Sequence, residues 1–363
     1  MAVTKQRHHA SPSKLFATLS KRRLPIMRAH LVISALLLFP TSTRAQSADA
    51  AIPDSILTRR LSHALDSMAA AGRFSGNVLL AHHDVPVFSH AYGLADHARG
   101  TPNGLETAFN LASVGKLFTA TAIDQLVLAG KLDLNAPVER YWPDYPNRAV
   151  AHKVTIGQLV AMTSGIGGDI FGTPETAHGI RTIPDYLRQF VDQPLDFEPG
   201  TKRAYSNAGY VLLGALVERI AKQPYEAYLR EHIFTPAAMT RTGFYDADSL
   251  PAFAAVGYTT GEEGVTEGPL HPNTAGLPGR GSPAGGSYST VTDLLRYVHA
   301  QRTGAIAGTS RTPRGWAGGS PGANTFLVPD LPGDYTLVVL ANIDPPAAER
   351  VQAMVRAWLT EKR

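Results

Sequence analysis

Strand-like segments of this chain are confined to its two ends, and the long stretch between them has the apolar spacing of helices. Residues 77–81 and 85–92 are short β-type runs, and residues 324–328 and 335–341 form a second such pair. Helical apolar spacing is found in the segments 53–71, 119–129, 156–162, 183–191, 209–222, 225–234 and 347–359. We therefore predict an α+β fold in which both chain ends build one antiparallel sheet and a mostly helical region is inserted between them.

The same order predicts where the two parts of the fold meet. We expect residues of about 53–112 and 284–363 to form the sheet part, and residues of about 119–283 to form the helical insertion. The chain has 363 residues, of which 44% are hydrophobic, and this excludes a disordered chain and suffices for a large core. A cleft between the sheet and the inserted helices is the expected place for a functional site.

The first 45 residues differ from the rest of the chain in charge. They contain eight Lys and Arg side chains and no Asp or Glu, and a basic stretch at 21–28 precedes the apolar run 31–39. Thr43-Arg44-Ala45 then offers the small residues that a signal peptidase reads. We expect residues 1–45 to be a signal peptide, with Met27 as an alternative start, and residues 46–363 to be an exported domain, periplasmic or secreted.

Removal of this leader changes the electrostatic character of the protein. The whole chain carries a net charge of +4, so the eight leader cations leave −4 on residues 46–363. An acidic body gives no electrostatic reason to expect nucleic acid as a partner.

The apolar run of the leader is too short for a permanent membrane anchor. The chain contains no cysteine, which excludes thiol catalysis and Cys-ligated metal sites.

A Ser and a Lys three residues apart form the first candidate for chemistry. On a helix, Ser113 and Lys116 would share one face, which places the Lys amine beside the Ser hydroxyl. A neutral amine can take the hydroxyl proton, and burial lowers a Lys pKa toward that role. The same spacing occurs at Ser11 and Lys14 in the leader, and a helix cap beside a solvated cation is the alternative. The apolar residues around Lys116 favour the functional interpretation.

The pattern Tyr-x-Asn is the second candidate, and it occurs twice. At Tyr205 and Asn207 it leads into an apolar helical segment, 92 residues after Ser113. At Tyr145 the following residue is Pro146, which favours a loop. We therefore expect the functional pair to be Tyr205 and Asn207.

Four stretches in a fixed order resemble one known group of enzymes. They are residues 109–138 around Ser113 and Lys116, Thr-Ser-Gly at 163–165, Tyr-x-Asn at 205–207, and Gly-Gly-x-x-Ser-Thr at 285–290. These resemble the serine β-lactamases and penicillin-binding proteins, and most of all the class C β-lactamases, the D-alanyl-D-alanine carboxypeptidases and the family VIII carboxylesterases. The resemblance covers about residues 74–359.

This resemblance implies a role for each matched residue. Ser113 would be the nucleophile that accepts the acyl group, Lys116 and Tyr205 would share proton transfer, and Asn207 would hold the substrate. The backbone N–H groups of Ser113 and Gly319 would form the oxyanion hole. No cofactor is implied.

The third sequence element of the group is altered in this chain. The group places Lys-x-Gly or His-x-Gly on an edge strand beside the site, and Trp316-Ala317-Gly318-Gly319 stands at the matching place. This is similar to the Trp-x-Gly pattern of family VIII carboxylesterases, which implies that Trp316, Gly318 and Gly319 contact the substrate. A Trp packed in the core is the other open interpretation of Trp316.

Two other kinds of chemistry find little support. Residues 318–322 match the Gly-x-Ser-x-Gly elbow of α/β-hydrolases, in which the residue after the Ser donates its N–H to the oxyanion. Here that residue is Pro321, which has no N–H. No His-Glu-x-x-His motif is present, and we expect no metal site.

We expect an exported serine hydrolase that acts through an acyl-enzyme on a small-molecule ester or peptide substrate. Trp316 offers no charge to a substrate carboxylate, so esterase activity is favoured over β-lactamase activity. The alternative is a non-catalytic ligand-binding or cell-wall-binding protein on the same fold, because the segment between Val298 and Gly315 is shorter than in the group.

Overall fold

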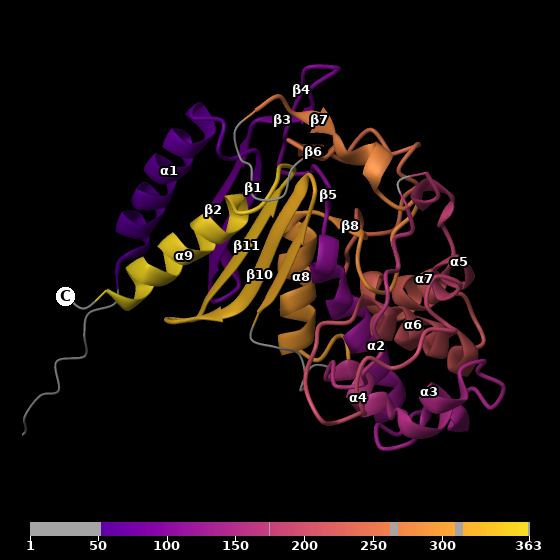
Figure 1. Ribbon diagram of the computed structural model, residues 1–363. Helices are drawn as coiled ribbons and strands as arrows, with labels where there is room; N and C mark the ends of the chain where they lie inside the picture. Colours follow the sequence, from indigo (N-terminus) through magenta and orange to yellow (C-terminus); the bar gives the residue numbers. More distant parts are fainter. Residues whose placement is uncertain (1–51, 174, 262–267, 309–314, 362–363) are drawn as a thin grey trace, which may run out of the picture. The chain divides into compact units, whose positions relative to one another are not determined.

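The main sheet takes its strands from both ends of the chain. The computed structural model describes residues 52–361 except 174, 262–267 and 309–314, so the predicted signal peptide lies outside the described residues. Figure 1 shows strands from the start of the chain (indigo) beside strands from its end (yellow). The antiparallel order is β2-β1-β11-β10-β9, with β1 (Gly76–His82), β2 (Val85–Tyr92), β9 (Trp316–Ser320), β10 (Ala323–Leu331) and β11 (Tyr335–Ala341).

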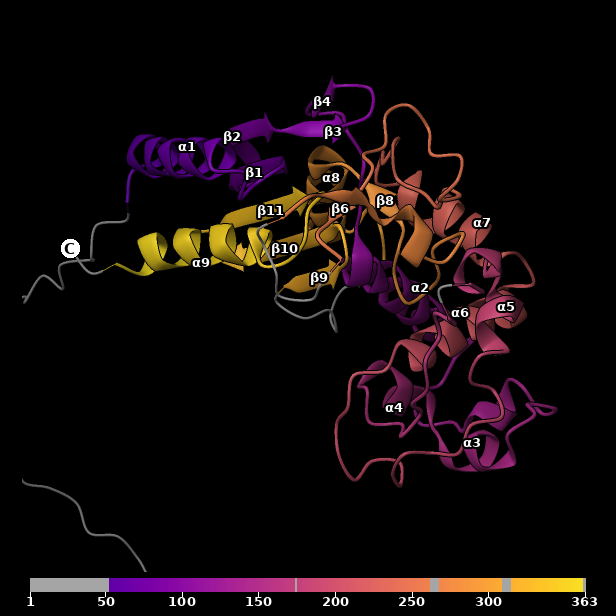
Figure 2. The same ribbon diagram turned by 45° about the horizontal axis from the view of Figure 1, so that its top comes forward.

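Each face of this sheet packs against a different core, because strand side chains alternate between the faces. Val78 joins the core under α1 (Asp54–Ala70) and α9 (Ala347–Thr360). The next residue, Leu79, joins the core that contains α8 (Val291–Arg302) and the inserted helices. Figure 2 shows α8 and α9 on opposite sides of the strands β10 and β11. The predicted α+β architecture, with a sheet built from both chain ends, is confirmed.

The middle of the chain supplies most of the remaining helices. They are α2 (Lys116–Leu128), α3 (Arg148–Lys153), α4 (Ile156–Val160), α5 (Ile183–Leu187), α6 (Asn207–Ala221) and α7 (Tyr225–Leu229). The helices α2 and α6 are apolar on nearly all sides and are buried along most of their length, as expected for central helices.

Short elements connect the helical region to the sheet. Three two-stranded ribbons pair β3 (Leu94–Asp96) with β4 (Thr101–Pro102), β5 (Phe109–Asn110) with β8 (Tyr288–Ser289), and β6 (Tyr258–Thr259) with β7 (His271–Pro272). Short helical turns are η1 (Ala112–Gly115), η2 (Val138–Arg140), η3 (Ala177–Gly179), η4 (Arg230–Phe234) and η5 (Asn273–Gly276).

Several helix boundaries differ from those expected from the sequence. The helix expected at 119–129 begins at Lys116 and follows directly on the turn η1. The helix expected at 225–234 is α-helical only to Leu229 and continues as a π-helical turn, η4. The six-residue α3 was not predicted, because so short a helix has no measurable period.

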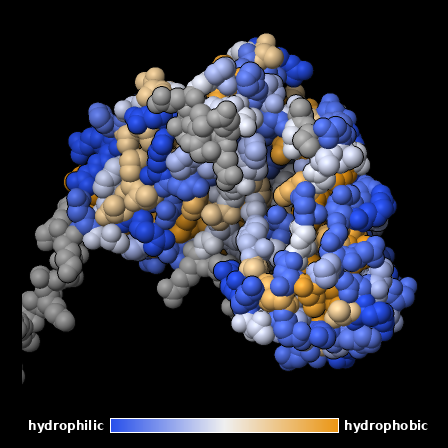
Figure 3. Space-filling model, viewed as in Figure 1, coloured by the Kyte–Doolittle hydropathy of each residue, from blue (hydrophilic) through white to orange (hydrophobic). Residues whose placement is uncertain are grey.

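The visible surface of the protein is largely polar. Figure 3 shows hydrophilic residues over most of one face and hydrophobic patches over the helical region.

No helix in the described part of the chain combines the length and the apolar character needed to cross a bilayer. The same residues contain no group of three or more His, Asp and Glu side chains that could hold a metal ion.

Candidate active site

Ser113 lies in a tight helical turn between the strand β5 and the helix α2. The turn η1 is of the 3-10 type, in which residues three apart lie one above the other. The Nζ of Lys116, the first residue of α2, therefore lies 3.2 Å from the Oγ of Ser113. The contact expected from the spacing is present, and a 3-10 turn produces it.

Lys116 is a buried amine surrounded by oxygen atoms. Its side chain is 1% exposed, and its Nζ donates hydrogen bonds to the Oδ1 of Asn207 at 2.7 Å and to the carbonyl oxygen of Ala284. Burial lowers the pKa of Lys116 from 10.5 to about 7. Near neutral pH a substantial fraction of this amine is therefore unprotonated, as a general base must be.

Tyr205 contacts Ser113 as well. Its hydroxyl oxygen lies 2.5 Å from the Oγ of Ser113, and its ring centre lies 4.8 Å from the Nζ of Lys116. Burial of the phenol raises the pKa of Tyr205, against the opposing effect of the Ser113 hydrogen bond. Tyr205 is still 59% exposed, and its raised pKa keeps the phenol protonated near neutral pH. It is placed to pass a proton to a leaving group.

The start of helix α6 places Tyr205 and Asn207 on either side of a capping residue. Ser206 caps the helix by accepting the N–H of Gly209 at 2.9 Å, and its hydroxyl donates to the carbonyl of Ile166 at 2.6 Å. Asn207 is anchored through Oδ1 to Lys116, so its Nδ2 donor is the group left to face a substrate carbonyl.

The second Tyr-x-Asn pattern has a structural role. Tyr145 is fully buried in the main core, and Asn147 caps helix α3 by accepting the N–H groups of Ala149 and Val150. The structure thus brings only the pair at 205–207 to Ser113, as the sequence context favoured.

The edge strand β9 approaches Ser113 at Gly318. A Cβ atom on Gly318 would lie 2.5 Å from the carbonyl oxygen of Leu111 and 2.9 Å from the backbone nitrogen of Ser113, so only glycine fits there. The next residue, Gly319, lines the pocket that contains Ser113. The backbone of β9 thus passes close to Ser113, beside the pocket.

Trp316 lies at the start of the edge strand β9, two residues before Gly318. It pairs with Leu327 at the start of β9, is half-buried and packs against the main core. Like Lys116, Tyr205 and Gly318, it is not among the described residues that line the pocket. Side chains alternate along a strand, so Trp316 shares the inward face of Gly318. This packing agrees with one of the two open interpretations, and contact of Trp316 with the substrate stays a prediction.

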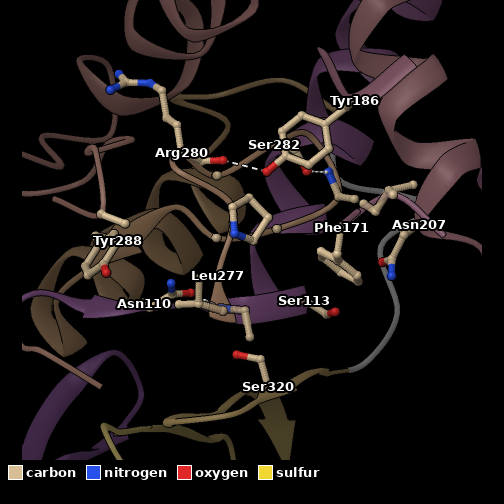
Figure 4. A pocket seen from close by; sticks show the side chains of 18 of the residues that line it. Asn110, Ser113, Phe171, Tyr186, Asn207, Leu277, Arg280, Ser282, Tyr288 and Ser320 are labelled. Carbon is tan, nitrogen blue, oxygen red and sulfur yellow. Dashed lines mark hydrogen bonds between the residues drawn. The ribbon is translucent and has the colours of Figure 1, made fainter. Parts of the chain in front are cut away.

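A pocket opens beside Ser113 (Figure 4). Its empty space, part of which is open to solvent, amounts to about 640 Å³. Ser113, Asn207 and Gly319 lie on its wall. Large apolar and aromatic side chains make up much of the rest: Ile170, Phe171, Tyr186, Tyr245, Leu277 and Tyr288. Sequence reasoning missed all six, because most of them lie in loops rich in Gly and Pro, where no periodic pattern marks an inward-facing side chain.

Arg280 is the one charged residue among the described residues of the pocket wall, and its charge is paired. Its guanidinium donates to both carboxylate oxygens of Glu226 at 2.8 and 2.7 Å and to Asp246 at 2.9 Å. These carboxylates raise the pKa of Arg280 further above its usual range. Figure 4 shows the guanidinium directed away from Ser113. The described wall is thus suited to an uncharged group.

Ser320, the serine of the Gly-x-Ser-x-Gly match, also lines this pocket. It ends β9 and pairs with Ala323 in a hairpin that leads into β10. An α/β-hydrolase elbow requires a strand followed by a helix, so the structure does not support this alternative.

The fold and the Ser113-Lys116-Tyr205 geometry define the class of serine hydrolases that use a Ser-x-x-Lys nucleophile. Comparison with known proteins identifies the family, since a family model described as Beta-lactamase matches residues 61–361. The chain therefore belongs to the beta-lactamase family, and its relatives include a putative penicillin-binding protein and an esterase. The predicted relationship and fold class are both confirmed.

Two relatives illustrate the family. Esterase EstB of Burkholderia gladioli is 34% identical over 280 residues, which cover 68% of this chain and 70% of EstB. The putative penicillin-binding protein PbpX of Bacillus subtilis is 30% identical over 263 residues, covering 72% of this chain and 64% of PbpX. The chain thus spans less than two thirds of the length of PbpX.

Solved structures show the same fold. A penicillin-binding protein from Bacillus halodurans superimposes with a TM-score of 0.70 at 28% identity, covering 81% of this chain and 99% of that chain. The D-amino acid amidase from Ochrobactrum anthropi, complexed with D-phenylalanine, gives a TM-score of 0.71 at 22% identity and covers 84% of this chain and 98% of its own. At that identity the second likeness concerns the fold alone.

Proposed function

We propose that this protein hydrolyses an uncharged ester or amide through an acyl-enzyme on Ser113. One observation carries the proposal: the Oγ of Ser113 contacts both the hydroxyl of Tyr205 at 2.5 Å and the amine of a buried lysine, Lys116, at 3.2 Å. A serine flanked by a lysine of lowered pKa and a protonated phenol is equipped both to lose a proton and to return it.

Acylation would proceed in two linked steps. The neutral amine of Lys116 takes the proton of Ser113 while Oγ forms a bond to the substrate carbonyl carbon. The tetrahedral intermediate collapses, the bond to the leaving oxygen or nitrogen breaks, and that atom receives its proton from Tyr205, which Lys116 reprotonates. The oxyanion would accept hydrogen bonds from the N–H groups of Ser113 and Gly319, and such donors contribute roughly 10²–10³ in rate each.

Deacylation would use the same groups in reverse. A water molecule replaces the leaving group and gives one proton to the neutral amine of Lys116 as its oxygen attacks the acyl carbon. The bond to the Oγ of Ser113 then breaks, and Ser113 regains its proton. No cofactor enters any of these steps.

The pocket supports an uncharged substrate. Its described walls include several aromatic side chains, the charge of Arg280 is paired, and Trp316 stands where the family has a Lys or His. A substrate carboxylate would therefore find little charge on the pocket wall to bind. A neutral acyl ester has no carboxylate, so its binding does not depend on a charge-assisted hydrogen bond there. The likeness to EstB, which is named an esterase, agrees with this preference.

The experiment is hydrolysis of p-nitrophenyl butyrate by the wild-type protein and by Ser113→Ala. We expect turnover by the wild type and its loss in the variant, with equal melting temperatures. No turnover by the folded wild type would favour the alternative of a non-catalytic binding protein on this fold.

We also propose that the protein is exported. The first 45 residues contain eight cations, no Asp or Glu, and an apolar run before Thr43-Arg44-Ala45, which is typical of a cleaved signal peptide. Secreted or periplasmic protein should then begin near Gln46. N-terminal sequencing of such material would contradict export by this route if residues 1–45 were still present.

A further inference from the structure

The residue before the nucleophile has an unusual backbone conformation. Ala112 has a φ of 44°, in the left-handed region that glycine enters freely and that a Cβ atom disfavours. Ala112 is linked directly to Ser113, so its conformation sets the direction of the Ser113 N–H and side chain. Something in the surrounding structure must stabilise this conformation.

Three neighbours hold Ala112 in place. Its N–H donates to the Oδ1 of Asn110 at 2.8 Å, and its carbonyl accepts the N–H of Gly286 at 3.1 Å. Gly285 packs so closely that a Cβ on it would overlap the Ala112 carbonyl oxygen. Asn110 is the neighbour that acts through a side chain, and such a contact can be removed by substitution.

Asn110 is itself well anchored. It belongs to β5 and pairs with Tyr288 of β8, so its backbone is fixed by a ribbon. Figure 4 shows its side chain at the wall of the same pocket as Ser113. A short polar side chain that accepts the N–H two residues ahead stabilises a turn in this way.

We propose that Asn110 is a positioning residue for Ser113. Its side-chain oxygen holds Ala112 in the left-handed conformation, which keeps the Ser113 N–H and hydroxyl aligned for attack. The proposal rests on the assignment of Ser113 as the nucleophile. Without the Asn110 bond, Ala112 relaxes toward a right-handed conformation, which a residue with a Cβ prefers. Because the chain then holds Ser113 aligned for only part of the time, we expect the rate of acylation to fall on the order of tenfold.

A direct contact with substrate is the competing explanation, because Asn110 lines the pocket. A substitution at Ala112 separates the two. Glycine adopts positive φ without the Cβ penalty, so Ala112→Gly removes the need for the Asn110 bond. It would not replace a lost contact between Asn110 and the substrate.

The experiment is a double-mutant cycle with wild type, Asn110→Ala, Ala112→Gly and the double variant. The measurements are the rate of covalent labelling by a fluorophosphonate, kcat and KM for p-nitrophenyl butyrate, and Tm. We expect Asn110→Ala to lower labelling and kcat roughly tenfold with KM changed less than about twofold. In the Ala112→Gly background the same substitution should cost less than about threefold.

An equal loss in both backgrounds, a change in KM alone, or no loss at all would overturn the proposal. A folded wild type that is neither labelled nor active would instead refute the proposed function. Asn110→Asp and Asn110→Leu repeat the test at nearly constant volume. The Asp variant keeps an acceptor for the Ala112 N–H and should label several-fold faster than the Leu variant; equal rates would contradict the proposal.

Discussion

The Nζ of Lys116 lies 3.2 Å from the Oγ of Ser113, and only Val114 and Gly115 of the turn η1 separate the two residues in the chain. The pair is compact because the serine and the lysine are fixed by the same helical turn. Burial among the oxygen atoms of Asn207 and Ala284 then prepares the amine for proton transfer. The proposed serine hydrolase activity depends on that relationship.

Replacement of Lys116 by alanine should abolish acylation of Ser113. A positioned general base contributes typically about 10²–10⁴ in rate, and no other amine contacts the Ser113 hydroxyl among the described residues. The measurement is the rate of covalent labelling by a fluorophosphonate together with Tm. Lys131→Ala is the matched control, because Lys131 is an exposed lysine outside the pocket. Equal turnover by wild type and a folded Lys116→Ala would show that Lys116 is not the base.

The rate of acylation should rise with pH. Burial lowers the pKa of Lys116 to about 7, so the reactive neutral amine forms as the pH increases through that value. We expect kcat/KM for a neutral ester to increase through about pH 7 and then level off. A profile that falls through this range would contradict the assignment of Lys116 as a base.

The same shift has a consequence for stability. Between about pH 7 and 10.5 the unfolded chain holds the Lys116 proton and the folded protein does not. The contribution of this group to the free energy of unfolding therefore rises with pH across that window. The slope should be smaller in Lys116→Ala, as measured by denaturant unfolding at several pH values.

Ester hydrolysis should exceed β-lactam hydrolysis. Loss of a charge-assisted hydrogen bond to a substrate carboxylate forfeits roughly 1.5–3 kcal/mol, or about tenfold to a hundredfold in binding. A neutral ester carries no carboxylate and packs against the aromatic wall formed by Phe171, Tyr186 and Tyr288. The measurement compares kcat/KM for p-nitrophenyl butyrate and a cephalosporin on one preparation. A clear preference for the cephalosporin would refute the uncharged-substrate proposal.

Gly318→Ala should impair both activity and stability. The added Cβ would lie 2.5 Å from the Leu111 carbonyl and 2.9 Å from the Ser113 nitrogen, so β9 must move away from the nucleophile. Overpacking of this kind costs typically about 1–3 kcal/mol, and the oxyanion hole would be displaced as well. Gly179→Ala is the matched control, because its Cβ would meet no atom within 4 Å. Wild-type kcat and Tm in Gly318→Ala would show that β9 does not depend on this close approach.

The sequence was most informative where chemistry depends on local spacing. Ser113 and Lys116 are three residues apart, so their contact follows from almost any helical turn. The choice of Tyr205 over Tyr145 followed from the helix that begins after it, and the buried position of Tyr145 agrees with that choice. The antiparallel sheet followed from two strand pairs at opposite ends of the chain.

The sequence was least informative where the site depends on loops and long-range packing. Phe171 and Leu277 reach the pocket from segments without periodic pattern, and the left-handed φ of Ala112 has no sequence signal such as glycine. For Trp316 the sequence left substrate contact and core packing both open, and in the structure it shares the inward face of β9 and packs on the core. Its orientation depends on the register of β9, which local sequence does not determine.

The most direct test of the central claim is to identify the residue that a fluorophosphonate modifies. Intact-mass and peptide mass spectrometry of the labelled wild type should show one adduct per chain, on Ser113. The adduct should be absent in Ser113→Ala. It should remain on Ser113 in Ser320→Ala, which removes the serine of the Gly-x-Ser-x-Gly match on the pocket wall. An adduct on Ser320, or no adduct on the folded wild-type protein, would contradict the assignment of Ser113 as the nucleophile.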